Sequence, residues 1–270
     1  MQKKKTLRHA ITLKKKYGQH FLQDHTVCHR AVAAAELNAK SSVIEIGCGD
    51  GILTRYLLQE PIERLHIFEI DPEWATYVTK HCIDDRIVMH VLSILDYDFS
   101  LFAEHHPWTL VANLPYQITF PLLYRIQQYR SFIPSGVIMI QEEVAQKLTA
   151  QSGRHYGHAS LFFQHYFTWK LLDKVPPEAF IPAPKVVSRL IAFTAREHPE
   201  PIAHEPDFWR FVKYCFKQPR RTLHNNLKQS SFDSVLPSLE QTLLQKRAQQ
   251  LSHQELYHLW EQLQHLRDSS

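Results

Sequence analysis

Four consecutive residues, Asn113-Leu114-Pro115-Tyr116, carry the groups that could hold a planar base. They follow a short apolar segment, Leu110–Ala112, which predicts a buried strand running into a turn. Pro115 fixes its own φ and biases Leu114 toward an extended conformation. The Asn113 side-chain oxygen and the Leu114 carbonyl oxygen could then face one point beside the Tyr116 ring. Two acceptors next to an aromatic ring suit the binding of an exocyclic amino group.

The same turn suits methyl transfer to that amino group. The exocyclic nitrogen of adenine is a poor nucleophile because its lone pair is delocalised into the ring. Acceptance of both N–H groups, by Asn113 and Leu114, would favour a pyramidal nitrogen with an exposed lone pair. The Tyr116 ring would stack on the base and stabilise developing positive charge, so the gain comes from positioning and electrostatics. A base in a duplex must be flipped out to enter such a pocket. Phe180 is a candidate second stacking face, or alternatively a core residue.

A glycine-rich turn precedes this site in the chain. Gly47, Gly49 and Gly51 alternate after the apolar segment Val43–Ile46. Glycine allows close backbone approach and positive φ, although this spacing is not G-x-G-x-x-G and also fits a generic tight turn. Glu69 ends the next predicted strand, where a carboxylate can bind two ribose hydroxyls unless it is a bare exposed acid. Together these residues predict a nucleoside at the carboxyl ends of parallel strands. The Asn113–Tyr116 turn then favours a methyltransferase over an enzyme that binds a nicotinamide cofactor.

Alternating strands and helices would position these turns. Strands are expected at 43–46, 65–70, 87–92, 110–112 and 137–141, and helices at 26–37, 52–59, 74–82, 120–129 and 142–150. This alternation is typical of βαβ units and a parallel sheet. Two further strands are expected at 162–172 and 186–193, with an irregular loop over 176–184.

The C-terminal part has a different pattern. Residues 198–206, with three prolines, predict a linker. Helical spacing follows at 208–216, 222–227, 239–244, 247–251 and 254–266. We therefore expect a basic N-terminal arm over 1–24, an α/β domain over 25–199 and a small helical domain over 200–270.

Composition limits the class of protein. The 270 residues are 44% hydrophobic with a net charge of +4. No apolar run approaches the roughly 20 residues that span a bilayer, and the N-terminus lacks a signal-peptide core, so we expect a cytoplasmic protein without a membrane partner. The four cysteines are far apart and the 18 histidines are scattered. We therefore expect no metal site.

Clustered positive charge permits a nucleic-acid partner. The triplets Lys3–Lys5 and Lys14–Lys16 are either phosphate contacts or parts of a mobile tail. In the helical domain, Lys217, Arg220 and Arg221 predict an RNA-facing helix, or alternatively a solvated helix face.

Six motifs in succession resemble those of the ribosomal RNA adenine N6-dimethyltransferases. They lie at 17–24, 45–54, 113–116, 141–150, 156–157 and 180–188, and the resemblance also includes Phe216–Arg221. It implies a Rossmann-like, seven-stranded class I methyltransferase sheet with a small C-terminal α-helical domain. It also implies S-adenosylmethionine as methyl donor and two adjacent adenines near the 3′ end of small-subunit rRNA as substrates. The partner would be the immature small ribosomal subunit, late in its assembly.

The resemblance assigns roles to individual residues. The catalytic set would be Asn113, Leu114, Pro115, Tyr116 and Phe180, and the cofactor contacts Leu22, Gly47, Gly49, Glu69 and Asn113. Two further cofactor positions depart from the family pattern, because His20 replaces an asparagine and Ser93 replaces an acidic residue that accepts from the cofactor adenine. A charged acceptor contributes about 1.5–3 kcal/mol against about 1 for a neutral one. Ser93 would thus weaken cofactor binding by roughly tenfold, unless Asp96 reaches in instead.

Two alternatives remain at this point. The first is an RNA-binding assembly factor of the same fold that has lost catalysis, which His20 and Ser93 favour and the intact Asn113–Tyr116 turn opposes. The second is an adenine methyltransferase that acts on other RNA, such as large-subunit rRNA. The basic helical domain does not separate these two.

Overall fold

The computed structural model describes residues 7–9, 11–228 and 230–268, so the expected phosphate contacts Lys3–Lys5 lie outside it. The chain forms two compact units. The first comprises residues 1–145 and 168–195, and the second comprises residues 146–167 and 196–270. Residues 146–167, which the sequence places before the linker, therefore group with the C-terminal helices.

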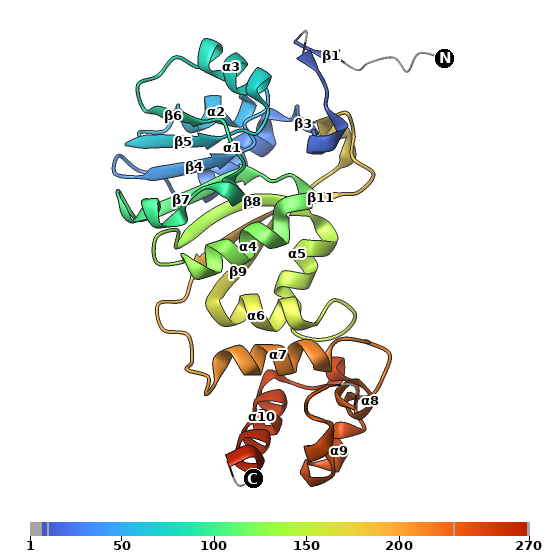
Figure 1. Ribbon diagram of the computed structural model, residues 1–270. Coiled ribbons are helices and arrows are strands. Elements are labelled where there is room, and N and C mark those ends of the chain that lie inside the picture. The colour runs from blue at the N-terminus through green and yellow to red at the C-terminus, as the bar shows by residue number, and fades with distance from the viewer. Residues whose placement is uncertain (1–6, 10, 229, 269–270) are drawn as a thin grey trace. The chain divides into compact units, whose positions relative to one another are not determined.

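A seven-stranded sheet forms the centre of the first unit, with the strand order β6-β5-β4-β7-β8-β11-β9. The strands are β4 (Ser42–Ile46), β5 (Arg64–Phe68), β6 (Ile87–His90), β7 (Trp108–Asn113), β8 (Ser135–Gln141), β9 (Phe167–Val175) and β11 (Ser188–Ala195). Neighbouring strands from β6 to β8 pair in parallel, and β11 pairs antiparallel to β8. Figure 1 shows β4, β5 and β7 side by side. The predicted α/β fold with a mostly parallel sheet is confirmed.

Helices connect these strands, namely α1 (His25–Ala34), α2 (Ile52–Leu57), α3 (Pro72–His81), α4 (Thr119–Gln128) and α5 (Glu142–Thr149). Val43, Val111 and Val137 of the sheet belong to the same buried cluster as Val27 of α1 and Leu57 of α2. The chain runs from β4 outward through β5 and β6, then returns to β7 on the other side of β4. The carboxyl ends of β4 and β7 thus flank the point where the strand order reverses, which is the usual ligand site of open α/β sheets.

Two short strand pairs lie outside this sheet. The hairpin of β1 (Leu7–Arg8) and β2 (Ile11–Thr12) begins the described chain. β3 (Phe21–Leu22) pairs antiparallel with β10 (Phe180–Ile181). The segment 176–184, expected to be wholly irregular, therefore contains a strand that holds the N-terminal arm.

The aromatic segment 162–172 was predicted wrongly over its first half. Residues His158–Tyr166 form helix α6, and the strand β9 begins only at Phe167. The Gly157 N–H donates to Ser160 Oγ at 3.0 Å, which caps the helix start. Phe163 and Tyr166 are both buried three residues apart, so the aromatic residues follow the helical period rather than strand alternation.

The second unit is helical, as predicted. It contains α6, α7 (Glu205–Cys215), α8 (Leu223–Leu227), α9 (Gln241–Leu244) and α10 (His253–Asp268), while the expected helix at 247–251 is a 3₁₀ turn over Ala248–Gln250. The rings of Phe208, Phe211, Phe232 and Trp260 contact one another in its core. Among the described residues, no helix has the length and apolar character needed to cross a membrane.

Candidate functional site

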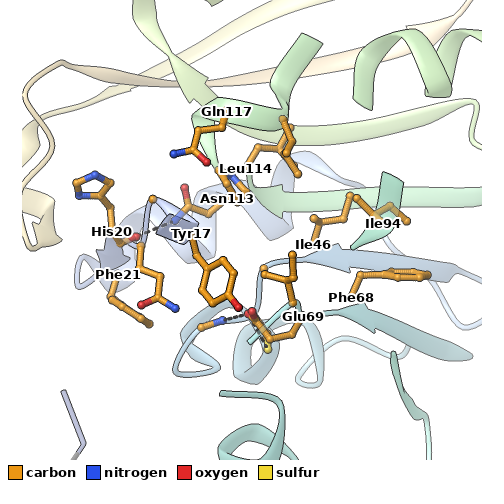
Figure 2. A pocket seen from close by; sticks show the side chains of 18 of the residues that line it. Tyr17, His20, Phe21, Ile46, Phe68, Glu69, Ile94, Asn113, Leu114 and Gln117 are labelled. Atoms are coloured by element: carbon orange, nitrogen blue, oxygen red, sulfur yellow. Dashed lines mark hydrogen bonds between the residues drawn. The ribbon is translucent and has the colours of Figure 1, made fainter. Parts of the chain in front are cut away.

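A pocket opens at the carboxyl ends of β4, β5 and β7 in the first unit (Figure 2). Its volume of about 210 Å³ far exceeds the ~10–15 Å³ that one water requires, so it has room for a ligand. Ten of the predicted site residues line it: His20, Leu22, Gly47, Gly49, Glu69, Ser93, Asn113, Leu114, Pro115 and Tyr116. Phe180 does not, because it is 3% exposed and packs in the core.

The glycine turn forms one wall of this pocket. Gly49 has φ +53°, and a Cβ atom there would lie 2.8 Å from Cε1 of Phe21. A side chain at this position is therefore excluded by conformation and by contact. The Gly49 N–H donates to Glu69 Oε2 at 3.2 Å, which ties the turn to the end of β5.

Glu69 presents a buried carboxylate to the pocket. It is 5% exposed, and its Oε1 accepts from the Asp71 N–H at 2.8 Å. Burial raises the pKa of Glu69, while the two backbone hydrogen bonds oppose the rise. A fixed carboxylate at this strand end suits the binding of ribose hydroxyls. The neighbouring Asp50 Oδ1 is also buried, with no hydrogen-bond partner in the described part of the chain, so both acids fit a ligand rich in donors.

The Asn113–Tyr116 turn forms another part of the pocket wall, and the sheet fixes its backbone. The Leu114 N–H donates to the Met139 carbonyl at 3.1 Å, which extends the pairing of β7 with β8. Asn113 Nδ2 donates to the His20 carbonyl at 3.4 Å, as Figure 2 shows. This bond orients the amide and leaves its Oδ1 without a donor among the residues described.

The Tyr116 side chain lines the pocket and is anchored by a hydrogen bond. Its hydroxyl shares a hydrogen bond of 2.7 Å with Ser188 Oγ. Burial raises the pKa of Tyr116, although the Ser188 hydrogen bond opposes the rise, so the phenol stays neutral at physiological pH. The His20 ring lies 6.1 Å from the Tyr116 ring between centroids, at an interplanar angle of 25°.

The N-terminal arm closes another side of the pocket, and Figure 2 shows Tyr17 extending across it toward Glu69. Ion pairs hold the arm in place. Lys14 Nζ lies 2.5 Å from Asp71 Oδ1, and Arg8 Nε donates to Asp50 Oδ2 at 2.8 Å. Lys14, an expected phosphate contact, is therefore engaged by acids of its own chain, which sequence reasoning missed.

Ser93 lines the pocket after β6, where the resemblance expects an acid. Its Oγ accepts from the Leu95 N–H at 3.2 Å and caps a short 3₁₀ turn. Asp96 is exposed and does not line the pocket. The structure therefore brings no carboxylate from this segment to the place of the missing one.

The predicted RNA-binding residues lie in the second unit. They were expected on a helix, and this expectation is wrong, because α7 ends at Cys215 and α8 begins only at Leu223, so all three lie on the turn between these helices. Lys217, Arg220 and Arg221 are all exposed. Asn226, only 3% exposed, orders this turn, because its Oδ1 accepts from the Gln218 N–H and its Nδ2 donates to the Cys215 and Gln218 carbonyls. In the sequence, Asn226 lies at helical spacing with Leu223 and beside Leu227, where an apolar residue is expected. This polar residue is the signal that could have pointed to its ordering of the turn. No group of three or more potential metal ligands occurs in the described residues.

The chain matches a family model described as ribosomal RNA adenine dimethylase over residues 10–265. The ribosomal RNA small subunit methyltransferase A of Syntrophotalea carbinolica is 37% identical over 230 residues, which cover 84% of this chain and 86% of that protein. The protein of the same name from Chlorobium phaeobacteroides is 33% identical over 261 residues, which cover 96% of this chain and 94% of that protein.

Solved structures are similar in fold. A dimethyladenosine transferase from Plasmodium falciparum has a TM-score of 0.75 at 20% identity, covering 93% of this chain and 98% of that chain. The 23S rRNA methyltransferase ErmE has a TM-score of 0.69 at 23% identity, and the match covers 90% of this chain and 99% of that chain. These likenesses confirm the predicted class I methyltransferase fold.

Proposed function

Because this chain belongs to the ribosomal RNA adenine dimethylase family, we propose that it dimethylates N6 of two adjacent adenines near the 3′ end of small-subunit rRNA. Its methyl donor is S-adenosylmethionine, which supplies an electrophilic methyl group. The proposed partner is the immature small subunit during its assembly, and the proposed compartment is the cytoplasm.

One observation carries the proposal. The turn suited to an exocyclic amino group and the glycine turn with Glu69 open into the same pocket, from the carboxyl ends of neighbouring strands. A nucleoside cofactor and a target base would therefore meet there. Such proximity supplies much of the rate enhancement when no strong base is needed.

The proposed roles follow from the contacts of each residue. Asn113 Oδ1 and the Leu114 carbonyl accept the two N6 hydrogens, since the amide is oriented by its bond to the His20 carbonyl. Tyr116 stacks on the base, and its neutral ring stabilises developing positive charge through its face. Glu69 and the backbone of Gly47 and Gly49 bind the nucleoside part of the donor.

The alternative of an assembly factor without catalysis is less well supported. It rests on His20 and Ser93, and both side chains still line the pocket beside an intact Asn113–Tyr116 turn. Action on other RNA, as the name of ErmE states for 23S rRNA, is a question of substrate that an assay resolves.

The experiment is transfer of tritiated methyl groups to unmethylated small subunits, to free small-subunit rRNA and to large-subunit rRNA. The product nucleosides are then identified by chromatography. We expect N6,N6-dimethyladenosine in the small-subunit rRNA. Label in large-subunit rRNA alone would support the other-RNA alternative, and binding without label would support the assembly factor.

A further inference from the structure

Ser188 is a buried polar residue to which the proposed function assigns no role. It begins β11, is fully buried, and pairs with Gln141 of β8 in the antiparallel ladder. Both of its neighbours in the chain are tied to the start of α5. The Val187 carbonyl accepts from the Glu142 N–H at 3.0 Å, and Arg189 Nε donates to Glu142 Oε2 at 2.5 Å. The backbone at Ser188 is therefore held on both sides.

The Ser188 hydroxyl contacts the residue that is proposed to stack on the target base. Ser188 Oγ and Tyr116 Oη are 2.7 Å apart, which is the usual length of an O–H···O hydrogen bond. In the sheet, β8 lies between β11 and β7, the strand that leads into the Asn113–Tyr116 turn. The bond thus spans one strand of the sheet, and neither hydroxyl has another hydrogen bond among the residues described.

This bond controls the direction in which the Tyr116 ring points. A tyrosine side chain has two rotatable bonds, so a hydrogen bond at its far end restrains both. A buried hydroxyl without a partner is unfavourable. Without the Ser188 hydroxyl, the half-buried phenol of Tyr116 would therefore turn toward water and carry the ring with it. Removal of both hydroxyls would leave two apolar groups and no such drive, because replacing both partners is nearly neutral.

We propose that Ser188 is a positioning residue, which holds the plane of the Tyr116 ring in the orientation needed to stack on the target adenine. The inference rests on the proposed function and adds to it a residue that does not touch the substrate. Groups that act on a reacting base must be held to within about 0.5 Å by neighbours that lock their rotamers. Ser188 supplies such a lock from a rigid part of the sheet.

The test removes the two hydroxyls separately and together. The measurement is single-turnover methyl transfer to unmethylated small subunits at saturating S-adenosylmethionine. We expect Ser188→Ala to lower the rate by roughly tenfold, because it leaves the phenol unpaired. We expect Ser188→Ala combined with Tyr116→Phe to match Tyr116→Phe alone within about twofold. The double variant should therefore transfer faster than Ser188→Ala, since the second substitution removes the group that displaces the ring.

Ser42→Ala is the matched control, because Ser42 is also buried but begins β4 and does not line the pocket. It should transfer methyl groups at the original rate. A purely structural role for Ser188 would make Ser188→Ala slow transfer by the same factor in the original protein and in Tyr116→Phe. That result, or normal transfer by Ser188→Ala, would overturn the inference and leave the proposed function intact.

Thermal unfolding shows whether each variant folds. If Ser188→Ala alone is unfolded, the double variant and Tyr116→Phe still decide the question, since equal rates support the inference and a slower double variant overturns it. An original protein that methylates no RNA would overturn both the inference and the proposed function.

Discussion

Ser93 already has a structural role, since its Oγ caps the 3₁₀ turn that follows it. Aspartate is an equally good cap, so Ser93→Asp can keep this bond and add a charged acceptor to the pocket. We predict that Ser93→Asp tightens S-adenosylmethionine binding by roughly tenfold, because a charged acceptor strengthens a hydrogen bond by about 1 kcal/mol or more. Calorimetry measures the effect, with Ser93→Ala as the control that loses the cap alone. Unchanged or weaker binding would argue that no cofactor donor faces this position.

Asn113 and Tyr116 differ from Ser93, because the proposed mechanism has them contact the base that reacts. We predict that Asn113→Ala and Tyr116→Ala each lower methyl transfer by roughly 100-fold or more, since each removes a group that stabilises the transition state. Tyr116→Phe keeps the ring and loses only the Ser188 bond, so its loss should be much smaller. Single-turnover transfer gives the rates, and thermal unfolding verifies the fold. Near-normal transfer in either alanine variant would contradict the mechanism.

At the scale of helices and strands, the sequence predicted those elements whose formation depends on the pattern of neighbouring residues. The strand β8 is a continuous apolar run, as buried parallel strands are, and its predicted start lies two residues from the observed one. The β3–β10 pair has two residues on each side and carries no periodicity. The burial of Phe180, which the sequence left open as an alternative, and the pairing of Lys14 depend on such long-range contacts, so the sequence could not decide either of them.

Asp71, the N-cap residue of α3, is one of two buried acids that bind the N-terminal arm. Asp71 is fully buried and binds both Lys14 and Gln19 of the arm, and the Asp71 hydrogen bond raises the pKa of Lys14. We predict that Asp71→Asn increases trypsin cleavage within residues 14–16 and weakens S-adenosylmethionine binding several-fold, because the arm lines the pocket.

Glu73→Gln is the matched control for this change. Glu73 also pairs with Lys14, at 2.9 Å, but its side chain is 52% exposed. Exposed ion pairs contribute little, so the control should resemble the original protein. Equal effects of the two substitutions would show that burial of Asp71 is irrelevant to the arm.

The outer strands β5 and β6 carry a histidine pair that responds to pH. His66 Nδ1 lies 3.2 Å from His90 Nε2, and His66 packs on the Trp108 ring. Burial lowers the pKa of His66 from 6.5 to about 4 and also lowers that of His90. The unfolded chain therefore takes up these protons first as pH falls below about 6.5, so the folded state loses stability between pH 6.5 and 4.

We predict a loss from His66 on the order of 1–3 kcal/mol in the free energy of unfolding across that range. His66→Phe should reduce this pH dependence, whereas His29→Gln, at an exposed position of α1, should leave it unchanged. Denaturant titrations at several pH values measure it. Identical pH profiles for all three proteins would refute the assignment.

At the scale of the whole molecule, the two proposed binding functions belong to different units. The pocket is lined entirely by residues of the first unit. The turn between α7 and α8 that carries Lys217, Arg220 and Arg221, here called the basic turn, is ordered by Asn226 within the second unit. Binding of the donor and binding of RNA should therefore respond separately to substitution. The basic turn has the exposed cations that phosphate contact requires.

We predict that Arg220→Glu combined with Arg221→Glu weakens binding to small subunits and makes log K less dependent on log salt concentration. Each lost phosphate contact removes about 0.7–0.9 from the slope, so the double variant should lose roughly 1 to 2. Its affinity for S-adenosylmethionine should stay unchanged, because the substitutions lie outside the pocket.

Lys170→Glu combined with Lys174→Glu provides a control with the same change in net charge, at exposed positions of β9 in the first unit. If the turn between α7 and α8 contacts RNA directly, this control should keep most of the affinity and the salt slope, since phosphate contacts act at short range whereas net charge acts through a screened field. Filter binding of unmethylated small subunits at several salt concentrations gives both quantities for each protein. Equal weakening by the two double substitutions would mean that overall charge, rather than this turn, accounts for the attraction to RNA.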